Sequence, residues 1–155
     1  MKIAYGAAVF LSGIFLEWIC STHLALLGLA PQVLLILTVS VALLSGPAIG
    51  QSFAFGWGLY LDLMSPHLFG ANALTLTLIG YWVGVVRRQM DASSPASQAM
   101  LAGLVSVLYF ILLALIGLAF RGKFFWPGWR FFFLEPFLNA LAAPFGFLFV
   151  RALMP

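Results

Sequence analysis

Charge is the scarcest feature of this sequence. Only 7% of its 155 residues are charged, whereas 64% are hydrophobic and the mean hydropathy is +1.12. A soluble domain carries roughly a quarter charged residues, which cover its surface with solvated groups. The composition therefore excludes an ordinary soluble domain and predicts an integral membrane protein. The net charge of +3 is modest and spread over several loops, so we expect no nucleic-acid partner.

Residues that hold metals or disulfides are also rare. The single cysteine, Cys20, cannot form an intramolecular disulfide, and the chain has no Cys-x-x-Cys pair. His23 and His67 fall in separate predicted turns, and neither has a second ligand at a suitable spacing. We therefore expect no metal and no cofactor.

Motifs of catalysis are absent from the sequence as well. Neither Gly-x-Ser-x-Gly nor His-Glu-x-x-His occurs, and the segment Gly46–Gly50 lacks the Lys-Ser or Lys-Thr of a phosphate-binding loop. The sequence therefore predicts a protein that is not an enzyme.

Six hydrophobic segments fill the chain. They span about residues 3–20, 24–44, 47–64, 69–86, 99–120 and 132–153. A helix that crosses the bilayer needs about 20 apolar residues, and in hydrocarbon a helix satisfies its own backbone groups. We predict an all-α integral membrane protein, a compact bundle of about six transmembrane helices forming one domain over residues 1–155. Ser94 or Ser97 is expected to cap the fifth helix.

The distribution of basic residues predicts the orientation. With both termini in the cytoplasm, four basic residues lie inside and three lie outside, and the adjacent pair Arg87 and Arg88 follows a span directly. The inside set is Lys2, Arg87, Arg88 and Arg151; the outside set is Arg121, Lys123 and Arg130. The aromatic segment 124–131 is expected to lie along the membrane interface.

Small residues recur at helical spacing in the third and fourth spans. The third carries Gly46, Gly50, Ala54, Gly58 and Asp62, and the fourth carries Ala73, Thr77, Gly80 and Gly84. Small residues on one stripe let a second helix approach closely, which is how membrane helices pack. The stripes predict either tight packing within the bundle or a groove for the helix of a partner.

Two carboxylates lie near the predicted outer ends of spans. A charge inside hydrocarbon costs on the order of 3 kcal/mol, so it usually has a partner. For Asp62 we keep two interpretations open: a partner-binding site, or a cap on the start of the next helix, where backbone N–H groups attract negative charge. For Glu17 we favour contact with interface water.

Residues 55–65 and 68–74 resemble the rod shape-determining MreD family. The likeness rests on a Gly-(x3)-Asp-Leu core, here Gly58 to Leu63, followed by a turn, a glycine and a helix. It covers residues 31–89 closely and residues 132–151 more loosely. The matching motif positions are Gly58, Asp62, Gly70 and Asn72.

The resemblance implies a non-enzymatic role in the bacterial cytoplasmic (inner) membrane. MreD-like proteins act with MreC, a single-span protein, in the complex that directs side-wall peptidoglycan synthesis. That complex includes MreB filaments, a RodA-type glycosyltransferase and a class B penicillin-binding protein. The expected packing or partner-binding residues are Gly50, Ala54, Gly58, Asp62, Gly70, Asn72, Gly80 and Gly84.

A second interpretation is the substrate-binding subunit of a vitamin-type transporter. The family fold is similar to the S-components of energy-coupling-factor transporters. Such a site needs polar groups that converge in an open pocket, which requires Thr75, Thr77 and Asn139 to face Asp62. The polar residues near the outer turns are sparse, so we favour the scaffold.

Overall fold

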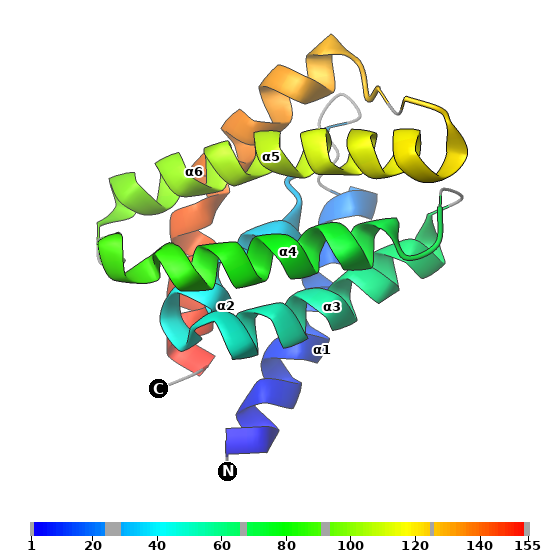
Figure 1. Ribbon diagram of the computed structural model, residues 1–155. Coiled ribbons are helices and arrows are strands. Elements are labelled where there is room, and N and C mark those ends of the chain that lie inside the picture. Colours follow the sequence, from blue (N-terminus) through cyan, green and yellow to red (C-terminus); the bar gives the residue numbers. More distant parts are fainter. Residues whose placement is uncertain (1, 24–28, 66–67, 91–93, 125, 154–155) are drawn as a thin grey trace.

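The computed structural model describes residues 2–23, 29–65, 68–90, 94–124 and 126–153. This part of the chain folds into six α-helices and one short 3-10 helix (Figure 1). They are α1 (Lys2–His23), α2 (Val33–Ser45), α3 (Pro47–Met64), α4 (Ala71–Val86), η1 (Arg87–Gln89), α5 (Pro95–Arg121) and α6 (Trp129–Leu153). The predicted all-α membrane bundle is confirmed.

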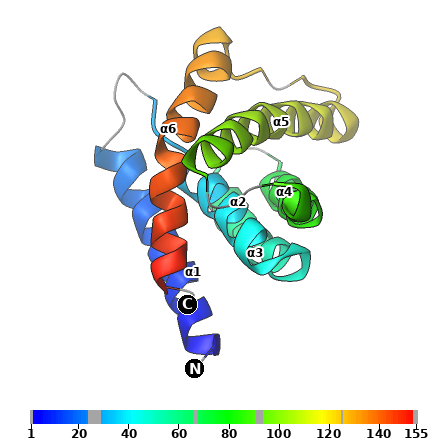
Figure 2. The ribbon, with the colours of Figure 1, turned by 90° about the vertical axis from the view of Figure 1, so that its left-hand side faces the viewer.

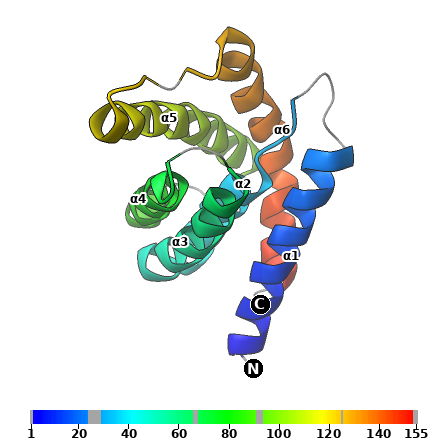
Figure 3. The ribbon, with the colours of Figure 1, turned by 90° about the vertical axis from the view of Figure 1, so that its right-hand side faces the viewer.

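The helices form two groups that cross one another. α3, α4 and α5 run back and forth in one layer, with α4 in contact with both neighbours (Figure 1). Figures 2 and 3 show this layer nearly end-on, while α1 and α6 run across it in contact with each other. The start of α1 and the end of α6 lie at the same end of the molecule in all three views.

The central helix is α2, which contacts every other α-helix. Its sequence is apolar on all sides, and ten consecutive residues, 34–43, are buried. A helix that is hydrophobic all round belongs in a core rather than at a surface. Packing around α2 therefore joins the two groups of helices.

The predicted second span, residues 24–44, is wrong in its extent. α2 begins only at Val33, and residues 30–32 before it are not helical; residues 24–28 lie outside the described part. Pro31 disfavours a helical conformation in the residue before it. At 13 residues α2 is about 20 Å long, shorter than the roughly 30 Å hydrocarbon core.

Length and composition qualify three described helices as membrane spans. They are Ala4–His23, Pro95–Arg121 and Trp129–Leu153. α5 begins four residues before the predicted start, with Pro95 in its first turn. Ser94 takes the N-cap position, as predicted for one of the two serines, but its side chain makes no capping hydrogen bond. Ser97 lies inside the helix.

Candidate functional site

The stripes of small residues on α3 and α4 face each other. A Cβ added at Gly58 would lie 2.4 Å from the Cα of Ala73, and one at Gly84 would lie 2.4 Å from the Cα of Pro47. Between these points, a Cβ at Gly80 would lie 2.8 Å from the carbonyl oxygen of Gly50. The two backbones therefore touch along the length of the hairpin, and no side chain fits between them.

The same hairpin also packs closely against α2. A Cβ at Gly50 would lie 2.6 Å from the Cβ of Ala42. Ala54, one turn further along α3, is fully buried, and its Cβ lies 3.0 Å from the position of an added Cβ at Gly80. Gly50 thus lies where three helices meet. Any side chain there would displace a backbone on two sides.

The carboxylate of Asp62 caps the start of α4. Its Oδ1 accepts hydrogen bonds from the backbone N–H and the side-chain amide of Asn72, both at 3.0 Å. Its Oδ2 accepts the backbone N–H of Ala73 at 3.0 Å. The first N–H groups of a helix have no partner within the helix, and they carry the positive end of its dipole. Of the two interpretations kept open for Asp62, the geometry matches the helix cap.

The backbone turns into this cap at Gly70. Its φ of +92° lies in the left-handed region, which an L side chain rarely adopts. Among the described residues no other atom lies within 4 Å of the position of an added Cβ, so the conformation is what favours glycine there. Gly70 thus sets the backbone direction just before Asn72 enters the cap.

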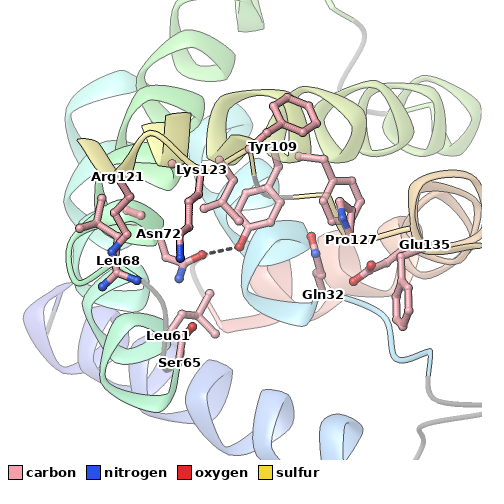
Figure 4. Close-up of a pocket in the computed structure, with 16 residues that line it drawn as sticks. Gln32, Leu61, Ser65, Leu68, Asn72, Tyr109, Arg121, Lys123, Pro127 and Glu135 are labelled. Atoms are coloured by element: carbon pink, nitrogen blue, oxygen red, sulfur yellow. Dashed lines mark hydrogen bonds between the residues drawn. The ribbon is translucent and has the colours of Figure 1, made fainter. Parts of the chain in front are cut away.

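Tyr109 extends this network to α5, and the sequence did not reveal it. Its hydroxyl donates to Oδ1 of Asn72, and Asp62, Asn72 and Tyr109 are all buried (Figure 4). Asn72 therefore connects α3 to α5 through two hydrogen-bonded side chains. The available signal was the tyrosine itself, because a tyrosine inside a predicted span needs a partner for its hydroxyl.

The far end of the hairpin is closed by Arg87. Its guanidinium donates to the carbonyl oxygen of Leu44 at 3.3 Å. An added Cβ at Gly46, whose φ is +95°, would lie 3.0 Å from the same guanidinium. The arginine therefore lies over the turn between α2 and α3, at the opposite end of α3 from Asp62.

Glu17 lies next to the start of α2. Its Oε2 accepts the backbone N–H of Leu34 at 3.0 Å. The late start of α2 brings unpartnered N–H groups next to the end of α1. The side chain remains partly exposed, so contact with interface water stays a prediction. Two carboxylates, Glu17 and Asp62, thus cap the starts of two helices.

The polar residues required by a transporter site do not converge on Asp62. The hydroxyls of Thr75 and Thr77 donate to carbonyl oxygens of their own helix. Asn139 belongs to a separate network: its Oδ1 accepts the backbone N–H of Gln32, and its Nδ2 donates to Ser106. Each of these side chains thus has its partner elsewhere, and none of their hydrogen bonds reaches Asp62.

A cavity of about 630 Å³ nevertheless opens beside the cap (Figure 4). It lies between α5, the start of α4 and the segment that leads into α6. Its polar lining includes Gln32, Asn72, Tyr109, Arg121, Lys123 and Glu135. Its volume lies within the range of about 300–1,000 Å³ that is usual for small-molecule sites.

Comparison with known protein families matches residues 2–154 to one described as rod shape-determining protein MreD. No curated protein and no solved structure matches the chain, so the likeness to transporter S-components stays a prediction. The family match includes every residue of the hairpin and its cap. The chain therefore belongs to the MreD family of rod shape-determining proteins.

Proposed function

We propose that this chain is a non-enzymatic scaffold of the rod complex in the bacterial inner membrane. Its family is one of rod shape determination. In the proposed role it holds an MreC-like single-span protein beside a RodA-type glycosyltransferase, a class B penicillin-binding protein and MreB filaments. The observation that carries the proposal is the α3–α4 hairpin, whose backbones interlock and whose turn is capped by a buried carboxylate.

In this proposal the small-residue stripes pack α3 against α4 and do not bind a partner. Gly58, Gly80 and Gly84 have the backbone of the neighbouring helix directly against them. A stripe occupied in this way leaves no groove for a foreign helix. The hairpin then supplies a stiff platform, and the partner docks on a face of the bundle outside the hairpin interface.

Affinity purification from mild detergent tests the scaffold. The tagged protein is expected to recover an MreC-like single-span protein together with cell-wall synthases. Asp62→Ala, which leaves three donors without an acceptor, is expected to reduce that recovery. Leu63→Ala is the matched control, because the adjacent side chain is 69% exposed and outside the cap. Equal recovery by both variants at equal expression would contradict the link between hairpin and partner.

The cavity supports a second candidate, the substrate-binding subunit of a small-molecule transporter. Its volume and mixed lining suit a solute. The same purification separates the two candidates. Recovery of ATPase subunits in place of an MreC-like protein would favour transport.

A further inference from the structure

The cavity beside the cap has an apolar wall. Among its lining residues are Leu61, Leu68, Phe110, Leu113, Phe124 and Phe131. A smaller cavity of about 90 Å³ adjoins it and shares Phe110, Phe124 and Pro127 with it. The other residues lining the smaller cavity are also apolar, among them Trp126. Together the two cavities offer a chamber lined by both polar and apolar groups, followed by an apolar one.

Charges of opposite sign lie at opposite sides of the larger cavity. Figure 4 shows Arg121 and Lys123 on one side, Glu135 with Gln32 on the other, and the paired Asn72 and Tyr109 between them. No ion pair joins either basic side chain to Glu135 in the described part of the chain. The cavity therefore has a cationic side and an anionic side.

An acceptor without a partner lies on the anionic side. The side-chain oxygen of Gln32, Oε1, is buried, and no described residue donates a hydrogen bond to it. A buried acceptor without a donor has lost its hydrogen bonds to water and gained none in return, which is unfavourable. A ligand that brings N–H groups to this side would remove that cost and would also face the carboxylate of Glu135.

Exposed aromatic side chains lie beside the cavity. Phe124 lines it, and the adjoining segment carries Trp126 and Trp129, all three of them exposed. Exposed aromatic side chains of this kind gather at the membrane–water interface. We therefore expect the cavity to lie at the depth of lipid headgroups, where a lipid of the surrounding leaflet can reach it.

We propose that the cavity binds an aminophospholipid, a lipid whose headgroup carries both a phosphate and a primary ammonium. The phosphate pairs with Arg121 and Lys123, and the ammonium donates to Glu135 and to Oε1 of Gln32. The start of one acyl chain lies in the smaller cavity near Trp126. A purely anionic headgroup brings no N–H group to Oε1 of Gln32, and a choline headgroup has no N–H to donate.

Three lysolipids with one acyl chain length test the proposal on the unmodified protein. Lysophosphatidylethanolamine, lysophosphatidylcholine and lysophosphatidylglycerol are titrated into delipidated protein in detergent. Binding is followed by tryptophan fluorescence and by native mass spectrometry. The ethanolamine lipid is expected to bind about tenfold more tightly than the other two, as loss of one charge-assisted hydrogen bond implies.

Other orders of affinity overturn the proposal. Equal affinity for all three lipids, or absence of binding, would show that the cavity does not distinguish between lipid headgroups. Preference for the glycerol lipid would indicate an anion site instead. Free phosphoethanolamine that binds as tightly as the lysolipid would indicate a soluble ligand.

Substitutions test which side of the cavity binds the ammonium and which side binds the phosphate. Glu135→Gln is expected to abolish the preference for the ethanolamine lipid over the choline lipid. Arg121→Gln combined with Lys123→Gln is expected to weaken the binding of all three lipids. Arg130→Gln is the control, since it removes an exposed cation of the same region that does not line the cavity. If Arg130→Gln weakened binding as much as the double variant, net charge rather than the site would explain the affinity.

Discussion

At the scale of single residues, Asp62 supplies hydrogen-bond acceptors for backbone N–H groups at the start of α4. The start of α4 has N–H groups without partners, and the carboxylate accepts two of them together with the amide of Asn72. The charge lies at the positive end of the helix dipole, which stabilises it without a basic partner. A buried carboxylate is therefore compatible with a nearly uncharged bundle.

Asp62→Asn is expected to lower the free energy of unfolding by about 2 kcal/mol, because the new amide group points a donor at an N–H donor. The melting temperature in detergent should fall by about 4–8 °C for a chain of this size. Thermal unfolding followed by size-exclusion fluorescence measures the change. Leu63→Ala, in an exposed position, should leave the melting temperature nearly unchanged. If the two variants have the same melting temperature, the cap does not stabilise the fold.

At the scale of elements, the hairpin interface depends on the absence of side chains. Gly58→Ala places a Cβ 2.4 Å from the Cα of Ala73, an overlap with backbone that no rotamer change relieves. We expect a loss of about 1–3 kcal/mol in stability, as for other overpacked interiors. Thermal unfolding of the two purified variants, Gly58→Ala and the control below, measures it.

Gly103→Ala on α5 is the matched control, because its nearest neighbours lie 3.6 and 3.7 Å from the added Cβ. That change should stabilise the helix by about 0.5–1 kcal/mol, since alanine loses less conformational entropy than glycine. The two substitutions are therefore expected to have opposite signs. A similar loss for both would contradict the interlocked hairpin.

Sequence pattern was informative for this hairpin and less so for its surroundings. The four-residue spacing from Gly46 to Asp62 predicted one face of α3, because helical periodicity is local. The late start of α2 was not predicted, because the run of residues 24–44 is almost entirely apolar and only Pro31 and Gln32 mark the point at which the helix begins. The contact of Glu17 with Leu34 and the cavity depend on how distant segments meet, which periodicity does not encode.

At the scale of the whole molecule, α5 is long enough to cross the bilayer, so its two ends are expected on opposite sides of the membrane. Its 27 residues extend about 40 Å, more than the hydrocarbon thickness of about 30 Å. Ala96 lies in the first turn of α5. Lys123 lies two residues beyond Arg121, the last residue of the helix. Both positions are exposed.

Cysteine labelling in intact cells tests the proposed orientation. In a Cys20→Ser background, Ala96→Cys is expected to react only with a membrane-permeant reagent, and Lys123→Cys also with an impermeant one. This result would place the end of α5 outside and both termini in the cytoplasm. The reverse result would invert the orientation, and labelling of both sites from one side would contradict α5 as a span.

The cap at Asp62 also has a consequence for biogenesis. An aspartate that enters hydrocarbon alone costs on the order of 3 kcal/mol, yet its acceptors are occupied by donors only ten and eleven residues further along the chain. We therefore expect the cap to form once the first turn of α4 has been synthesised. Membrane insertion of α3 and α4 would then be a single event, because the second helix supplies the donors that let the carboxylate of the first enter lipid.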